Sequence, residues 1–179
     1  MSAIVFFLSQ VELGFRKNPT PILTSASDLL GAKDPAKEFA QMVTDADGGT
    51  LFIDEAYQFD PAPKGSTANA SNKLLDLLMK VAEEKRDSMT FILAGYKEEM
   101  QGLLAYNPGF PSRFPREFTF DFPDYTENQL LKILTGMMKE RGLRFQSQKE
   151  CGVSIGRVIA RRIGRGAGTK GFGNARDVS

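Results

Sequence analysis

Two short apolar runs most constrain how this chain can fold, "GTLFIDEA" (residues 49–56) and "MTFILAGY" (residues 89–96). Each run is too short for a core helix and is apolar at consecutive positions, which is typical of strands buried on both faces in a parallel sheet. Between them, residues 72–86 place leucines on one stripe and charges on the opposite side, which predicts an amphipathic helix. The pattern predicts an α/β fold.

The remaining segments extend this prediction. Thr126 and Gln129 form a T-x-x-Q capping box ahead of a helix that ends at Gly142. From Pro123 onward only helices are predicted, so we expect a core over residues 1–124 and a partial α-helical lid over residues 125–179. The other predicted elements are an apolar core helix near residues 1–15, a short strand and polar turn over 21–30, a helix from Pro35 to Val43, a strand over 118–122 and a helix over 150–163.

Composition excludes several classes of function. The 179 residues include no histidine, which excludes histidine zinc sites and Ser-His or Cys-His catalysis. The single cysteine, Cys151, excludes an internal disulfide, and the formal charge of +1 disfavours a general polyanion binder. The N-terminus lacks a signal peptide's basic region, and no apolar run approaches the roughly 20 residues that span a bilayer. We expect an intracellular protein, cytoplasmic or nuclear.

Asp54 and Glu55 close the first apolar run and form the strongest candidate site. The carboxyl ends of parallel strands face the crevice where α/β proteins bind ligands. There an aspartate can hold the magnesium side of a nucleotide, and a neighbouring glutamate can polarise a water for attack on phosphate. Four apolar residues followed by Asp-Glu form the Walker B pattern. The alternative is a strand that simply ends in acidic turn residues.

Three later positions favour the nucleotide interpretation by their order along the chain. Tyr96 ends the second apolar run and suits a sensor of the terminal phosphate, Arg113 lies in the proline-framed "NPGFPSRF" and suits a charge-neutralising finger, and Arg176 follows the glycine loop "GFGNAR". Each has a plain alternative, because Tyr96 can be a core residue and either arginine a surface ion pair.

These stretches together resemble the CbbX/CfxQ and stage V sporulation protein K-like branch of the AAA+ ATPases, and most closely its fungal members. The residues that carry the resemblance are "GGTLFIDEAYQF", "FILAGYKEEM", "NPGFPSRFP…FDFPDYT", "ARRIGRG" and "GFGNAR". The resemblance implies a three-layer αβα P-loop NTPase-like core with a helical lid, ATP and Mg²⁺ as cofactors, assembly into a homo-oligomeric ring, a hexamer, and remodelling of an unidentified protein substrate.

The resemblance also assigns residue roles. It makes Asp54 the magnesium-side carboxylate, Glu55 the catalytic base and Tyr96 the sensor-1 residue. Arg113 becomes the arginine finger, with Arg116 as a weaker candidate. On the lid, Arg176 is the sensor-2 arginine and Asn174 a second nucleotide-binding residue.

The family's phosphate loop, G-x-x-x-x-G-K-[ST], has no counterpart, because the sequence contains no Gly-Lys pair. The glycine stretches at residues 63–67 and 164–173 lack its residue order. By resemblance the chain begins after that loop and stops as the sensor-2 helix begins, and we expect a sheet without the phosphate-loop strand. The strands over 90–96 and 118–122 would then pair directly, or the chain would be marginally stable.

Three functions follow as hypotheses. The first is an AAA+ ATPase that remodels protein partners, although this chain would be weak or inactive without a phosphate loop. The second is a non-catalytic AAA+-like interaction module. The third, nucleic-acid binding, is disfavoured because it rests on one basic stretch over residues 157–170, which contains Arg157, Arg161, Arg162, Arg165 and Lys170.

Overall fold

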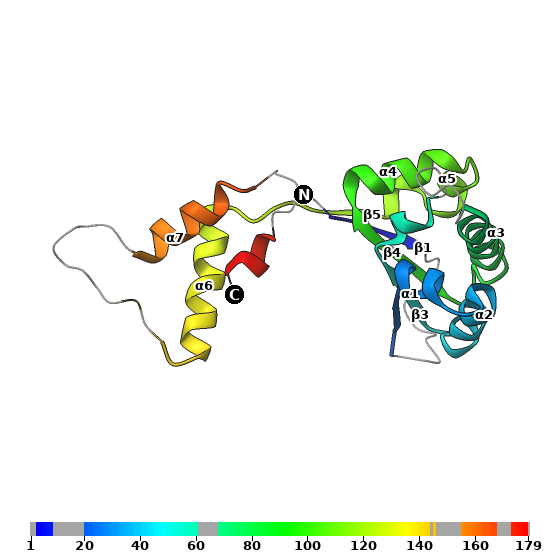
Figure 1. Ribbon diagram of the computed structural model, residues 1–179, viewed down its shortest axis with the longest axis horizontal. Helices are drawn as coiled ribbons and strands as arrows, with labels where there is room; N and C mark the ends of the chain where they lie inside the picture. The colour runs from blue at the N-terminus through cyan, green and yellow to red at the C-terminus, as the bar shows by residue number, and fades with distance from the viewer. Residues whose placement is uncertain are drawn as a thin grey trace. The chain divides into compact units, whose positions relative to one another are not determined.

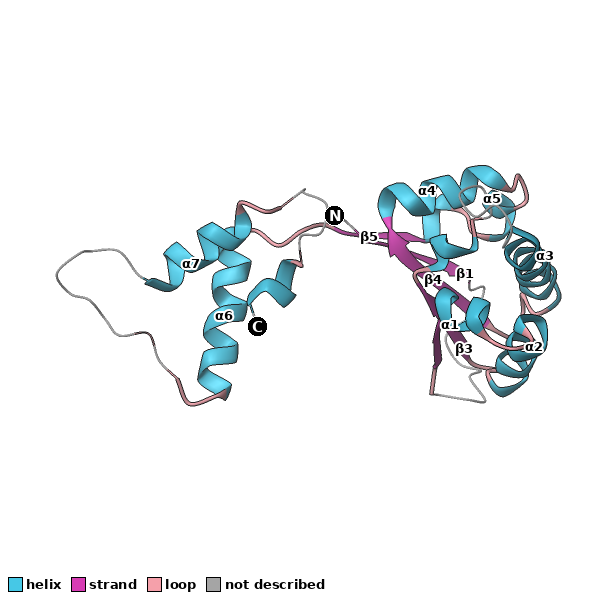
Figure 2. Ribbon diagram, in the orientation of Figure 1, coloured by secondary structure: helices cyan, strands magenta, loops and turns pink. Residues whose placement is uncertain are grey.

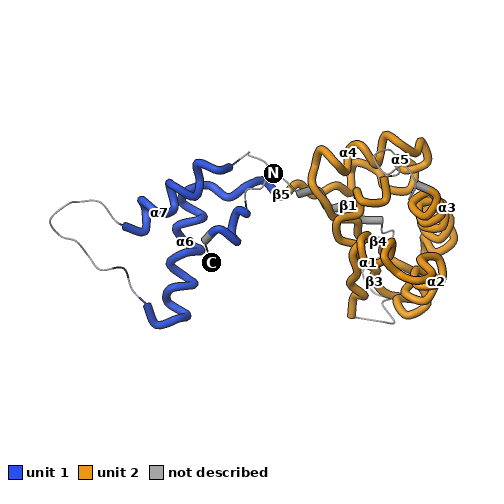
Figure 3. Tube along the Cα trace, in the orientation of Figure 1, with its two compact units in different colours: residues 1–2, 123–179 blue, residues 3–122 orange. Residues whose placement is uncertain are grey.

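The computed structural model describes residues 3–8, 20–60, 68–143, 145, 155–167 and 173–178 (Figure 1). The chain divides into two compact units (Figure 3). The sheet unit comprises Ala3–Phe122, and the helical unit comprises Pro123–Ser179 together with Met1–Ser2. Among the described residues, no helix combines the length and apolar character needed to cross a membrane.

The sheet unit contains five described strands in the order β2-β3-β4-β1-β5. Strands β2, β3 and β4 are parallel neighbours, whereas β1 pairs antiparallel with both β4 and β5. Strands β4 and β5 therefore run in the same direction, and β1 runs against them. The strands are β1 Ala3–Leu8, β2 Ile22–Ser25, β3 Thr50–Asp54, β4 Thr90–Tyr96 and β5 Thr119–Phe122.

The sheet unit confirms the predicted α/β, P-loop NTPase-like class, since helices alternate with the parallel strands. The core lies between one face of the sheet, formed by Leu51 and Ile53 on β3 and Phe91 and Leu93 on β4, and the helices beside it (Figure 2). Apolar residues at helical spacing, such as Phe39 and Val43, supply the opposite wall. The helices are α1 Ala26–Gly31, α2 Pro35–Asp45, α3 Ala68–Glu84, α4 Lys97–Tyr106 and α5 Phe110–Arg113, with one-turn helices η1 Ala56–Phe59 and η3 Arg116–Phe118.

The opposite face of the sheet is less covered. Phe52 and Ile92, which alternate with the core residues of β3 and β4, are half-buried. At the sheet's two edges, Leu23 is 69% exposed, and Phe120 and Phe122 are 52% and 57% exposed. The core therefore depends on one face of the sheet.

The N-terminus differs from its prediction. Residues 3–8 form strand β1 where a helix was predicted, and residues 9–15 lie outside the described part of the chain. Ile4, Val5 and Phe6 favour extended structure, and β4 and β5 would each expose unpaired backbone groups without a strand between them. The expectation that β4 and β5 pair directly is therefore wrong, because β1 lies between them.

Two local predictions are corrected and one is confirmed. The polar turn predicted after β2 is helix α1, because Ser25 Oγ caps the helix by accepting from the Asp28 backbone N–H at 3.1 Å. The proline-framed stretch "NPGFPSRF", which the sequence predicts to be a loop, instead contains the one-turn helix α5, and Arg113 is its last residue. The predicted capping box is confirmed, since Thr126 Oγ1 accepts from Gln129 N and the Thr126 N–H donates to Gln129 Oε1 at 2.8 Å.

The helical unit contains α6 Glu127–Glu140, α7 Ile155–Gly164 and the one-turn helix η4 Asn174–Val178. Small residues let α7 approach α6 closely. A Cβ on Gly156 would lie 3.1 Å from a Leu131 methyl group on α6, and a Cβ on Gly164 would lie 3.2 Å from Glu127 Cγ. Ala160, between the two glycines, is buried.

Candidate functional site

The carboxyl ends of three parallel strands carry polar residues at one edge of the sheet. Ser25 ends β2, Asp54 ends β3 and Tyr96 ends β4. Ser25 and Asp54 are register partners on neighbouring strands. This edge, which we call the acidic edge after Asp54 and Glu55, is where α/β sheets of this kind bind ligands.

The turn after β3 fixes both carboxylates. Glu55 has a left-handed backbone with φ 50°, and Asp54 Oδ1 accepts from the Glu55 N–H at 2.8 Å. Gln58 Nε2 donates to Glu55 Oε2 at 2.6 Å, so the carboxylate is held across the single turn of η1. A left-handed non-glycine residue is strained, and such strain is concentrated at functional sites.

A tyrosine pair connects β3's turn to the end of β4. The ring centroids of Tyr57 and Tyr96 lie 5.8 Å apart at an interplanar angle of 39°. Gly95 makes room for this contact, because a Cβ there would lie 2.8 Å from a Tyr57 ring carbon. Burial raises the pKa of Tyr57, the negative charge of Glu55 raises it further, and smaller contributions come from Tyr96 and Glu99, while the hydrogen bond to Gln58 opposes them. Tyr96 thus lies beside the turn that carries Glu55.

Sequence reasoning missed three residues of this edge, Ser25, Tyr57 and Gln58. Ser25 and Gln58 each had a detectable signal. Ser25 follows an apolar strand and precedes Asp28 by three residues, as a helix cap does. Gln58 follows Glu55 by three residues, the spacing of one 3₁₀ turn.

Arg113 is held by α3. Its Nε donates to the Met79 carbonyl at 3.0 Å and lies 3.4 Å from Glu83 Oε2, and its Nη1 donates to the Gly109 carbonyl at 3.3 Å. The side chain is 27% exposed. These contacts give Arg113 a structural role in fixing α5 to α3. Arg116, on η3, is exposed.

Asn174 and Arg176 belong to the helical unit. Asn174 has a left-handed backbone, its Oδ1 accepts from the Tyr125 N–H at 3.0 Å, and its Nδ2 donates to Asp124 Oδ1 at 3.3 Å. Gly173 N donates to Asp177 Oδ2 at 2.9 Å, and a Cβ on Gly173 would collide with that carboxylate. The "GFGNAR" stretch thus stabilises the helical unit locally, and Arg176 is exposed on η4.

The residues of the acidic edge can bind a magnesium ion only if other groups, such as phosphate oxygens and water, supply the remaining ligands. In the described residues no three acidic or cysteine side chains gather closely enough to hold a metal ion. Asp54 is exposed, and magnesium in nucleotide sites is bound by one or two carboxylates plus phosphate oxygens and water. Asp54 therefore suits the protein side of a magnesium–nucleotide complex rather than a metal site by itself.

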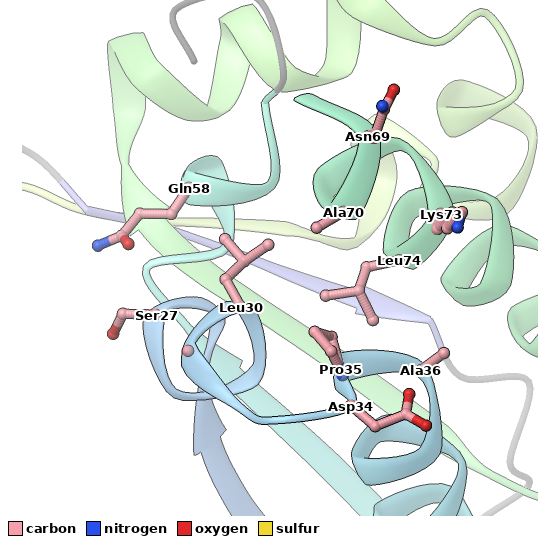
Figure 4. Close-up of a pocket in the computed structure, with 11 residues that line it drawn as sticks. Ser27, Leu30, Asp34, Pro35, Ala36, Gln58, Asn69, Ala70, Lys73 and Leu74 are labelled. Atoms are coloured by element: carbon pink, nitrogen blue, oxygen red, sulfur yellow. The ribbon is translucent and has the colours of Figure 1, made fainter. Parts of the chain in front are cut away.

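A cavity of about 730 Å³ lies next to the acidic edge, between α1, α2, η1 and the start of α3 (Figure 4). Its apolar lining comes from Leu30, Pro35 and Leu74, which lie around the same space in Figure 4. Gln58 belongs to the lining and also holds Glu55.

A sheet whose parallel strands end in an acidic pair and are flanked by helices agrees with a P-loop NTPase-like core. Sequence comparison gives the family. The chain is 35% identical over 99% of its length to a CfxQ homologue of Trieres chinensis, 37% identical over 64% to stage V sporulation protein K of Bacillus subtilis, and 33% identical over 93% to the chloroplastic ribulose bisphosphate carboxylase/oxygenase activase of Cyanidioschyzon merolae. The chain belongs to this CfxQ and stage V sporulation protein K branch of the AAA+ family.

The likeness covers only part of each relative. The chain spans 57%, 34% and 54% of the three proteins, respectively. No family profile matches the chain.

Proposed function

We propose that this chain is part of an AAA+ ATPase that couples ATP binding and hydrolysis to the remodelling of a protein partner, within a homo-oligomeric ring. The observation that carries the proposal is the acidic edge. There Asp54 and the strained, hydrogen-bonded Glu55 lie at the end of β3, and Tyr57 brings that turn against Tyr96 at the end of β4.

The proposed roles follow from this geometry. Asp54 would contact the magnesium ion, which supplies charge neutralisation on the phosphates when bound. Glu55, held by Gln58, would orient the attacking water, and Tyr96 would contact the terminal phosphate. Arg113 as an arginine finger would have to leave its contacts with Met79 and Glu83, so we place it second to a structural role. Arg176 and Asn174 remain lid candidates for the nucleotide.

A second candidate, a non-catalytic AAA+-like interaction module, is favoured by the direction of β1. Leu8 at the end of β1 pairs with Phe91 at the start of β4, whereas Ala3 pairs with Tyr96. The chain therefore leaves β1 at the edge of the sheet opposite to Asp54. A phosphate loop must follow the central strand at the acidic edge, and in this chain the segment after β1 does not begin there.

The two candidates are separated by nucleotide binding and phosphate release by the full chain. We expect weak MgATP binding and turnover several orders of magnitude below that of a complete AAA+ enzyme, because positioning and electrostatics supply nearly all phosphoryl-transfer catalysis. The variant Glu55→Gln tests the site, and Glu84→Gln, an exposed acid on α3, is its matched control.

Turnover that is abolished by Glu55→Gln and retained by Glu84→Gln supports the ATPase. Absence of MgATP binding at millimolar concentration supports the interaction module. Turnover that is equal in the wild type and both variants contradicts the proposed roles of Glu55 and the acidic edge.

A further inference from the structure

We propose that the outer face of α7 is a docking surface for an acidic, aliphatic helical segment of a protein partner. The proposal concerns the helical unit alone and requires no nucleotide, so it is separate from the ATPase proposal. The charge of α7 and the turn after it is entirely positive. This segment has no acidic residue and carries four arginines, Arg157, Arg161, Arg162 and Arg165.

The inner face of α7 is defined by its contacts with α6. Gly156, Ala160 and Gly164 recur every four residues and so lie on one side of α7. Gly156 lies against Leu131 of α6, Gly164 lies against Glu127 of α6, and Ala160 between them is buried. At 100° per residue, the opposite side of the helix carries Val158 and, around it, Arg161, Arg162 and Arg165. The outer face is thus an apolar centre flanked by guanidinium groups.

Exposure agrees with this division. Val158 and Ile155 are 40% and 39% exposed, high values for aliphatic residues on a packed helix. All four arginines are exposed. Among the described residues, the ion pair recorded for α7 joins Arg161 to Glu127 of α6 at 3.4 Å, with both side chains about half exposed, and such a pair contributes little to stability.

This combination selects one class of partner. Arginine is enriched in protein interfaces. Its planar guanidinium pairs with a carboxylate through two parallel hydrogen bonds, and its aliphatic stem packs on apolar groups. A partner helix with acidic residues on either side of an aliphatic stripe complements both the charge and the apolar centre. The apolar face is too narrow for membrane insertion, since only Ile155 and Val158 form it.

Nucleic acid would use the arginines but leave the apolar centre without a role. Phosphate contacts depend on basic groups and salt, not on exposed valine and isoleucine. The chain as a whole has a formal charge of only +1. An acidic aliphatic helix accounts for the arginines and for Val158 together.

The test uses the full chain and three labelled probes, measured by fluorescence anisotropy at low and physiological salt. The probes are a synthetic helical peptide of alternating glutamate and leucine faces, poly-L-glutamate, and a single-stranded oligonucleotide of similar charge. We expect the Glu-Leu peptide to bind best, with an affinity that falls as salt is raised.

Two variants of equal charge change distinguish the surface from general electrostatics. Arg162→Glu with Arg165→Glu should weaken binding of the Glu-Leu peptide at least about tenfold. Lys33→Glu with Lys37→Glu, exposed positions in the sheet unit, should leave it within about twofold. Val158→Ser should weaken the Glu-Leu peptide several-fold and leave poly-L-glutamate unchanged, which tests the apolar centre. Circular dichroism establishes that each variant is folded.

Equal losses in the two double variants, no binding of the Glu-Leu peptide at low salt, or tighter binding of the oligonucleotide than of the peptide would each overturn the proposal. None of these measurements involves ATP. The docking proposal can therefore be wrong while the ATPase proposal is right, and the ATPase proposal can be wrong while the docking proposal is right.

Discussion

The two halves of the sheet differ in strand direction and in how well their side chains are buried. The β2–β3–β4 half is parallel, supplies Leu51, Ile53, Phe91 and Leu93 to the core, and ends in the acidic edge. The β1–β5 half contains the antiparallel strand, and its outer strand exposes Phe120 and Phe122. The first half has the parallel strands, ending at one edge, that a nucleotide site is expected to use. The second half does not have this arrangement, because β1 runs in the opposite direction.

This difference shows that closing a sheet and building a phosphate site are separate requirements. Strand β1 pairs with β4 over six residues and with β5 over four, so backbone hydrogen bonding between them is restored. Direction does not matter for that purpose, because an apolar strand can pair either way. Direction does matter for the site, since only a parallel strand delivers the following loop to the acidic edge.

The largest expected effect comes from removing β1. A chain without residues 1–8 should lose at least about 3 kcal/mol of unfolding free energy, because two strand edges lose their partners at once. Urea denaturation followed by circular dichroism measures this loss. The control in the other half is Leu23→Asn, an exposed position of β2, which should change stability by about 0.5 kcal/mol or less. Equal stability of the shortened and full chains would show that β1 contributes nothing to the sheet.

A smaller effect is expected at Arg113. Its replacement by alanine should cost about 1–2 kcal/mol, because the Met79 carbonyl loses a charged donor and the exposed Glu83 loses its ion-pair partner. Arg116→Ala, at an exposed position, should be nearly neutral. Urea denaturation and ATP turnover are measured together. Unchanged stability with reduced turnover would instead favour the arginine-finger role.

The smallest effect concerns the titration of Tyr57. Its pKa is raised by burial and by Glu55, so the folded protein keeps the phenol protonated above the pH at which the unfolded chain ionises, about 10. The stability from neutral Tyr57 is therefore complete below pH 10 and is lost as pH rises through the folded pKa.

Tyrosinate absorbance measures this directly. Glu55→Gln should lower the Tyr57 pKa, because a neighbouring negative charge is removed, and Tyr57→Phe identifies which transition belongs to Tyr57. A titration curve that Glu55→Gln leaves unchanged would show that the two side chains are not electrostatically coupled.

The sequence predicted the half of the sheet whose local pattern matches its final structure. The consecutive apolar residues of β3 and β4 and the Thr126–Gln129 capping box are determined by short-range preferences, and these predictions are confirmed. Strand β1 was mistaken for a helix because its apolar run fits both structures and only the tertiary need of β4 and β5 decides between them. The contact of Arg113 with α3 joins residues 34 apart, which spacing alone does not reveal.

The direction of β1 is the central claim, and disulfide trapping tests it most directly. In a Cys151→Ser background, Ala3→Cys with Tyr96→Cys places two thiols at register partners of the antiparallel pair. Leu8→Cys with Tyr96→Cys places them at opposite ends of the pair. Mild oxidation should cross-link the first variant and not the second. Cross-linking of the second variant alone would mean that β1 runs parallel to β4 and delivers the following segment to Asp54, which contradicts the account.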